Sequence, residues 1–161
     1  MGLVHIYCGD GKGKTSAAVG LAVRAAGCGK RVVIARFLKT DNSGEVEILK
    51  KIPEVTLIPC RKTFGFVRSM DEETKRECAA YHRKLFGEAV KLAEHADLVV
   101  FDEIMAAVNY GMVPERDVLE FLENRPGRDQ TDGLEIVLTG RDPSEKLIAA
   151  ADYVSEICKR K

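Results

Sequence analysis

Short apolar runs alternate with longer segments of mixed polarity along the whole chain. The apolar runs are rich in β-branched residues and are bounded by glycine or polar clusters, a pattern typical of buried strands. Strands are therefore predicted at residues 3–8, 31–37, 55–58, 98–102, 135–139 and 153–157.

The segments between these runs have helical character. Residues 15–26 are rich in alanine and are followed by a glycine-containing stop at 27–29. Ser69 and Glu72 have capping-box spacing, which favours a long helix over 71–94. Further helices are predicted at 45–51, 105–110, 115–123 and 144–151, and polar loops at 39–44, 62–70 and 125–133.

Strands that alternate with helices indicate an α/β fold, with a mostly parallel sheet covered by helices on both faces. No internal repeat and no linker-like segment interrupts the alternation. Residues 1–161 are therefore expected to form a single nucleotide-binding domain, for the reason given next.

A glycine-rich segment joins the first predicted strand to the first predicted helix, the context that a phosphate-binding loop requires. Its residues are Gly9, Asp10, Gly11, Lys12, Gly13, Lys14, Thr15 and Ser16. Glycines let the backbone N–H groups face phosphate oxygens, and the helix N-terminus adds partial positive charge. Lys14 is expected to bind the outer phosphates and the Thr15 hydroxyl to bind Mg²⁺, so the predicted ligand is Mg-ATP.

The spacing of this loop departs from the usual pattern G-x-x-x-x-G-K-[ST], which would require glycine at Cys8. Gly9 instead gives a loop one residue shorter. A dinucleotide fingerprint, G-x-G-x-x-G, fits less well because it needs glycine at Lys14. A glycine-rich turn without a special role is the remaining alternative, and the adjacent lysine and threonine argue against it.

Two carboxylates, Asp102 and Glu103, end the apolar strand predicted at 98–102. P-loop proteins place an acid there to hold Mg²⁺ directly or through water, and the alternative is a cap on the following helix. Asp102 and Glu103 are therefore candidate metal ligands together with Thr15.

The charge balance argues against some partners. Lys plus Arg and Asp plus Glu number 25 each, which gives no general attraction to nucleic acid or to anionic lipid. The five cysteines form no C-x-x-C pair and suit the free thiols of a reducing compartment. With no apolar run long enough to span a membrane, a cytoplasmic location is expected.

The remaining candidate residues have functional or structural interpretations. Cys8 is either a reactive thiol beside a helix N-terminus or a small residue that ends a buried strand, and the second is favoured. Phe64 and Phe66 flank a glycine in a charged loop, where they either pack on the core or form a lid over a flat apolar ligand. The histidines lack metal-pair spacing and are expected to be structural: His5, His82 and His95.

An ordered series of motifs covers nearly the whole chain. It runs from G-D-G-K-G-K-T at 9–15 through G-L-A-V-R-A-A-G at 20–27 and D-E at 102–103 to R-P at 125–126 and L-T-G-R at 138–141. This series resembles the P-loop class of ATP:cob(I)alamin adenosyltransferases, also called corrinoid adenosyltransferases, whose own phosphate loop has the shortened form.

The resemblance implies a RecA-like P-loop NTPase fold, usually as a homodimer. It implies transfer of the 5′-deoxyadenosyl group of ATP to Co(I) of a corrinoid, cobalamin or a precursor, with release of triphosphate. Mg²⁺ would accompany ATP, and an electron-donor flavoprotein is a candidate partner. By motif match, residues 11–15 would hold the triphosphate, Thr15 and Glu103 the Mg²⁺, and Arg24 and Arg141 would lie near the nucleotide.

Co(I) is itself a strong nucleophile, so the reaction requires no general base. The protein must stabilise the triphosphate leaving group, which the resemblance assigns to Lys14, Thr15 and Glu103 as the catalytic set. It must also present C5′ of the ribose to cobalt.

The aromatic loop of the family, G-x-G-F-x-W, closes on the corrin and corresponds here to residues 63–68. Phe66 keeps the phenylalanine place and Arg68 stands in the tryptophan place, so Phe64 and Phe66 are the candidate corrinoid contacts. This difference, and a His-Pro-containing tail found in many members but missing here, motivate one alternative, a non-catalytic ATP- or corrinoid-binding relative. A P-loop kinase or NTPase acting at the γ-phosphate is a second alternative, and the short loop and the lack of an obvious acceptor base argue against it.

Overall fold

A computed structural model describes residues 2–161 of the chain. Its strands are β1 (Val4–Cys8), β2 (Val32–Arg36), β3 (Val55–Leu57), β4 (Leu98–Asp102), β5 (Glu135–Thr139) and β6 (Tyr153–Glu156). Its helices are α1 (Lys14–Gly27), α2 (Gly44–Leu49), α3 (Glu72–Ala93), α4 (Ile104–Asn109), α5 (Glu115–Glu123) and α6 (Glu145–Ala150), with a short 3₁₀ helix, η1 (Val67–Ser69). The α/β fold and the predicted alternation are confirmed.

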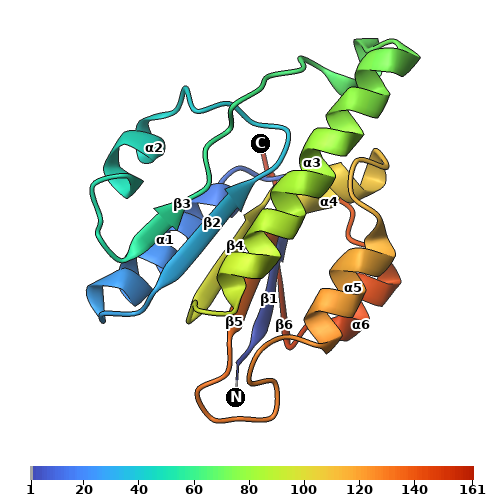
Figure 1. The fold of residues 1–161 in the computed structure, drawn as a ribbon. Helices are drawn as coiled ribbons and strands as arrows, with labels where there is room; N and C mark the ends of the chain where they lie inside the picture. The colour runs from blue at the N-terminus through green and yellow to red at the C-terminus, as the bar shows by residue number, and fades with distance from the viewer. Residues whose placement is uncertain (1) are drawn as a thin grey trace.

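Within the described residues, the strands form one sheet in the order β3-β2-β4-β5-β1-β6, and every neighbouring pair is parallel (Figure 1). β1 lies between β5 and β6, and β4 lies between β2 and β5. The carboxyl ends of β1 and β4 therefore meet at the same edge of the sheet, separated only by β5. Such an edge is where ligands bind in open α/β sheets.

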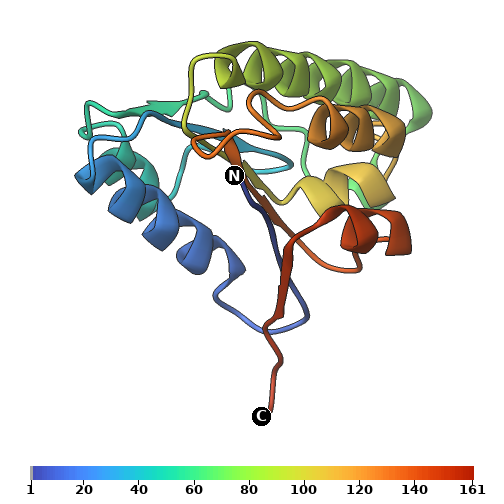
Figure 2. The same ribbon diagram turned by 90° about the horizontal axis from the view of Figure 1, so that it is seen from below.

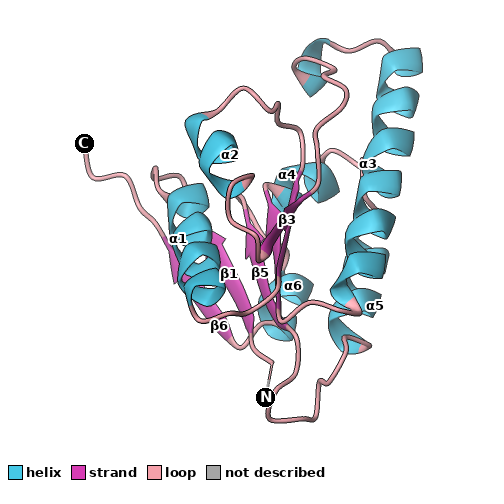
Figure 3. Ribbon diagram, turned by 60° about the vertical axis from the view of Figure 1, so that its left-hand side comes forward, coloured by secondary structure: helices cyan, strands magenta, loops and turns pink. Residues whose placement is uncertain are grey.

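Helices cover both faces of the sheet, as Figure 2 shows from below. α1 and α2 lie on one face, and α3, α4, α5 and α6 lie on the other. Figure 3 shows α1 and the long α3 on opposite sides of the strands. This arrangement is that of a RecA-like P-loop NTPase.

Successive side chains along the strands pack alternately into two separate hydrophobic cores. On β2, Val32 and Ile34 pack in the core beneath α1, while Val33 and Ala35 pack in the core beneath α3. Alanines of α1, such as Ala22, let this helix approach the sheet closely. Burial on both faces explains why the central strands read as continuous apolar runs.

The capping box predicted for Ser69 and Glu72 is wrong. Ser69 belongs to η1, and its hydroxyl donates to the Phe66 carbonyl. The N-cap of α3 is Asp71, whose carboxylate accepts from the Thr74 N–H at 2.7 Å. An Asp three residues before a free amide competes as well as Ser for this role, so the spacing alone could not choose between them.

Among the helices that the structure describes, not one combines the length and apolar character that crossing a bilayer requires.

Candidate active site

The glycine-rich loop leads directly from β1 into α1. Gly13 adopts a φ of 119°, a left-handed conformation that costs glycine little. A Cβ on Gly11 would lie 2.6 Å from the Ile157 carbonyl oxygen, so this position has no space for a side chain. The Gly11 N–H donates to that same carbonyl at 2.7 Å. The segment after β6 therefore supports the loop from behind.

The Lys14 ammonium lies across the loop. Its Nζ donates to the Gly9 and Gly11 carbonyls, at 2.8 Å each. Water can hydrogen-bond to these two carbonyls equally well. The ammonium can therefore leave them for anionic oxygens at a small cost in free energy. This places a positive charge at the mouth of the loop, where a phosphate chain would lie.

Thr15 and Asp102 join the loop to the central strand. The Thr15 hydroxyl donates to Asp102 Oδ1 at 3.0 Å, and the Thr139 hydroxyl donates to the same oxygen at 2.7 Å. Asp102 is only 2% exposed, and among the described residues its carboxylate accepts from side chains and from no backbone amide. A buried carboxylate with hydroxyl neighbours is the chemistry that a hard divalent cation requires.

Lys39 completes this cluster, and the sequence analysis missed it. Its Nζ donates to Thr15 Oγ1 at 2.8 Å and to Asp102 Oδ2 at 2.5 Å. The only sequence signal was its place just after the strand predicted at 31–37, at the carboxyl edge of the sheet. Within the polar loop 39–44, nothing distinguished it from a solvated lysine.

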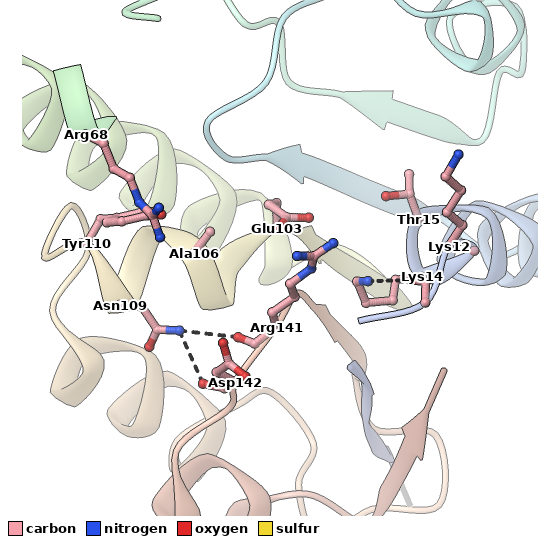
Figure 4. Close-up of a pocket in the computed structure, with 12 residues that line it drawn as sticks. Lys12, Lys14, Thr15, Arg68, Glu103, Ala106, Asn109, Tyr110, Arg141 and Asp142 are labelled. Carbon is pink, nitrogen blue, oxygen red and sulfur yellow. Dashed lines mark hydrogen bonds between the residues drawn. The ribbon is translucent and has the colours of Figure 1, made fainter. Parts of the chain in front are cut away.

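Glu103 follows directly and has a distinct backbone. Its φ of 62° is left-handed, which is uncommon for a residue with a side chain and is held here by its N–H donating to Thr139 Oγ1 at 2.8 Å. In Figure 4 its carboxylate points into the pocket, between Thr15 and Arg141. Asp102 and Glu103 thus occupy different positions, one buried behind the loop and the other lining the cavity.

Arg141 enters the same cavity from the end of β5. Its Nη2 is 3.5 Å from the Asp10 carbonyl oxygen, which links it to the phosphate loop. Asn109 fixes the backbone beneath it, because its Nδ2 donates to the carbonyls of Arg141 at 3.3 Å and Asp142 at 3.2 Å (Figure 4). The guanidinium is therefore placed to face an anion in the loop.

These residues line a cavity of about 620 Å³. A second cavity of about 770 Å³ lies beside it, lined by Lys39 and by residues 65–69 of the aromatic loop. The two cavities share four lining residues: Arg68, Glu103, Ala106 and Tyr110. The phosphate loop and the aromatic loop thus open into adjoining spaces with a common wall.

The structure separates the predicted site residues into groups. The first cavity brings together Gly11, Lys12, Gly13, Lys14, Thr15, Glu103 and Arg141. Gly9, Asp10 and Ser16 belong to the same loop and helix start, although they do not line the cavity. Arg24 lies apart, in the last turn of α1, about 15 Å along the helix axis from Lys14.

The two candidate aromatic residues have different environments. Phe66 is 86% exposed and lines the second cavity. Phe64 is half-buried, with its ring 5.6 Å from that of Tyr81 and 6.3 Å from that of His82. Phe64 therefore packs against α3, whereas Phe66 faces the cavity. Arg68, Tyr110 and Asn109 line the cavities without having been singled out as contacts.

Burial decides the state of two titratable groups. Desolvation, followed by the charge of Glu156, raises the pKa of the Cys8 thiol, so this thiol behaves as a buried strand residue. Burial lowers the pKa of His82 to about 4. His82 lies in the ring cluster with Phe37, Phe64 and Tyr81, which supports its structural assignment.

Comparisons with known proteins point to one family. The model of the family described as ATP:corrinoid adenosyltransferase BtuR/CobO/CobP matches residues 1–161. A corrinoid adenosyltransferase of Escherichia coli (strain K12) is 33% identical over 159 residues, covering 97% of this chain and 76% of that protein. The corrinoid adenosyltransferase CobA of Salmonella typhimurium is 33% identical over 157 residues, with the same two shares, and one from Pseudomonas aeruginosa is 29% identical over 159 residues, covering 97% of this chain and 74% of that protein. The glycine-rich loop, the acidic strand end and the adjoining cavities of this chain fit the match. The chain belongs to the ATP:corrinoid adenosyltransferase family.

Proposed function

We propose that this chain transfers the 5′-deoxyadenosyl group of ATP to Co(I) of a corrinoid and releases triphosphate. The observation that carries the proposal is the common wall between the two cavities. One cavity has the cationic phosphate loop, and the other has an exposed phenylalanine, Phe66, suited to a flat apolar ring. A nucleoside that projects from the first cavity toward this wall would present C5′ to a metal centred in the second.

The electrons of this step balance without a further reactant. Co(I) donates an electron pair to C5′, the bond from C5′ to the triphosphate oxygen breaks, and that pair leaves with triphosphate. Cobalt thereby becomes formally Co(III). The chain needs no general base, and its task is to orient the ribose and to stabilise the leaving anion.

The cationic groups of the first cavity would perform the second task. Lys12 and Lys14 line it from the glycine-rich loop, and Arg141 lines it from the segment after β5 (Figure 4). The loop amides at Gly13 and Lys14 would add donors at the helix N-terminus. We assign the catalytic set to Lys14, Thr15 and Glu103, and we keep nucleotide-binding roles for Gly9, Asp10, Ser16 and the more distant Arg24 as predictions.

The residues present fit Mg²⁺. The Thr15 hydroxyl and the buried Asp102 carboxylate already hold a cationic group, the Lys39 ammonium, and Glu103 supplies a second carboxylate nearby. Thr15, Asp102 and Glu103 would hold the ion directly or through water. When bound, Mg²⁺ would neutralise charge on the triphosphate oxygens.

The wider assignments rest on the family. We propose that residues 1–161 act as one domain, that the enzyme forms a homodimer in the cytoplasm, and that an electron-donor flavoprotein supplies Co(I). We further propose that Phe66 and, through its packing, Phe64 shape the corrinoid cavity.

The test is a reducing assay. Protein, ATP and Mg²⁺ are mixed with chemically reduced cobalamin or cobinamide, and the light-sensitive Co–C product is followed spectrally. The proposal predicts product with at least one corrinoid. Failure with both, in protein that binds ATP, would overturn it and would leave the non-catalytic relative as the explanation.

A further inference from the structure

We propose that Lys39 is an internal counter-ion of the metal site, which occupies the cation position in nucleotide-free protein and must leave Thr15 and Asp102 for a divalent cation to bind. The inference rests on the assignment of these two residues as metal ligands under the proposed function. It adds a residue that neither the motifs nor the family comparison pointed to.

The hydrogen bonds of Thr15 place the Lys39 ammonium in competition with a metal ion. Its hydroxyl donates its one proton to Asp102 and accepts from the Lys39 ammonium. A hydroxyl binds a metal through a lone pair of its oxygen, and Lys39 already occupies one of the two lone pairs of Thr15 Oγ1. A metal ion on the other lone pair would lie close to the ammonium, so the repulsion between the two positive charges sets them in competition.

The carboxylate of Asp102 is shared in the same way. Oδ1 accepts from the hydroxyls of Thr15 and Thr139, so Oδ2 is the oxygen left for a cation, and Lys39 binds it. The Asp102 side chain is only 3% exposed and that of Lys39 is 27% exposed. Opposite charges at this depth attract strongly, and a divalent ion beside a retained ammonium would be repelled as strongly.

The position of Lys39 is built into the loop that carries it. On one side, the Phe37 N–H donates to the Asp102 carbonyl at 2.9 Å. On the other, the buried Arg36 donates to the Thr40 carbonyl at 2.9 Å. Leu38, directly before Lys39, has a φ of 52°, and this left-handed turn aims the chain back at the site. Lys39 is therefore held toward Asp102 and is not a surface lysine that reached it by chance.

Lys39 also lines the second cavity, so a released ammonium has an adjoining open space to enter. The exchange consequently moves one positive charge from behind the phosphate loop toward the cavity wall. It keeps the buried carboxylate paired in both states, which avoids an uncompensated buried charge.

The first test measures Mn²⁺ binding to nucleotide-free protein by electron paramagnetic resonance. Mn²⁺ alone is the probe because ATP would add its own charges. Lys39→Met is expected to bind Mn²⁺ about tenfold more tightly than wild type, since the metal no longer displaces a charge-assisted hydrogen bond. Lys50→Met, at an exposed lysine that pairs with Glu47, is expected to match wild type. Equal or weaker Mn²⁺ binding by Lys39→Met would overturn the proposal.

Lys39→Gln serves if Lys39→Met folds poorly, because it keeps hydrogen-bond donors and loses the charge; the same tightening is expected. A second measurement uses wild type alone. Mn²⁺ should increase the rate of Lys39 acetylation, followed by mass spectrometry with Lys50 as internal reference, whereas an unchanged rate means that Lys39 stays in place and contradicts the exchange.

These outcomes separate the inference from the proposed function. Wild type that binds Mg-ATP and forms product, with Mn²⁺ affinity unchanged in both Lys39 variants, overturns the role of Lys39 only. Wild type that binds no nucleotide overturns the function, whatever Mn²⁺ does.

Discussion

The Thr15 hydroxyl donates to the Asp102 carboxylate at 3.0 Å, although the two residues are 87 positions apart in the sequence. Thr15 lies in the first turn of α1, and Asp102 is the last residue of β4. The sheet order brings them together, because β1 and β4 both end beside β5. This bond joins the phosphate loop to the predicted metal site.

Asp102→Asn should weaken the binding of Mg-ATP at least about tenfold, because it removes the buried negative charge while nearly preserving its shape. It should also lower stability by about 1–3 kcal/mol, since the Lys39 ammonium loses its ionic partner. Calorimetry and urea unfolding measure the two effects. Asp117→Asn, at a carboxylate paired with the exposed Arg116, is the matched control. Unchanged nucleotide affinity in Asp102→Asn would remove Asp102 from the metal site.

Lys14→Ala should reduce the affinity for inorganic triphosphate by about 100-fold, equivalent to about 2.7 kcal/mol. The fold should remain intact, because within residues 2–161 the ammonium bonds only the Gly9 and Gly11 carbonyls, which water can then solvate. Equilibrium binding and circular dichroism check both expectations, with Lys50→Ala as control. Full activity in Lys14→Ala would mean that the phosphate site is misplaced.

Phe66→Ala and Phe64→Ala should separate ligand contact from packing. The Phe66 ring is 86% exposed, so its removal should change stability by less than about 0.5 kcal/mol and raise KM for the corrinoid. The Phe64 ring packs against Tyr81 and His82, so its removal should cost about 2–3 kcal/mol. Urea unfolding and steady-state kinetics measure the pair. The reverse pattern would exchange the two roles.

His82 should make stability fall as the solution is acidified. Burial holds its pKa in the folded protein at about 4, below the ordinary value of 6.5, so the unfolded chain takes up the proton first. This contribution is complete above pH 6.5 and is lost as the pH falls toward 4. Between pH 7 and pH 5 the loss should be about 1–2 kcal/mol, measured by urea unfolding. His82→Leu should lack this component, whereas His95→Gln, at an exposed position, should retain it. Equal pH dependence in His82→Leu and wild type would contradict it.

Much of this fold could be predicted because its signals are local. Strands buried on both faces, such as β2 and β4, have continuous apolar sequences. The closely spaced glycines of the phosphate loop predict a tight turn by themselves. The pairing of Thr15 with an acid at 102 or 103 also followed, since parallel strands end at one edge. The sequence could not distinguish the buried Asp102 from the cavity-lining Glu103, because that difference depends on the left-handed backbone at Glu103.

What the sequence did not reveal depends on long-range packing. Lys39 becomes part of the site because Phe37 bonds the end of β4 and Arg36 bonds the Thr40 carbonyl within the loop. The different environments of Phe64 and Phe66 arise from where α3 passes, since Tyr81 and His82 belong to that helix. Asp71, and not Ser69, caps α3 because Ser69 belongs to η1, which precedes α3 in the sequence.

The central claim is that the bond broken lies between C5′ and the triphosphate, and phosphorus NMR of a single-turnover reaction tests it most directly. With Mg-ATP and reduced corrinoid, intact triphosphate should accumulate in a one-to-one ratio with the Co–C product. ADP with phosphate, or a phosphorylated acceptor, would place the chemistry at the γ-phosphate and contradict this account.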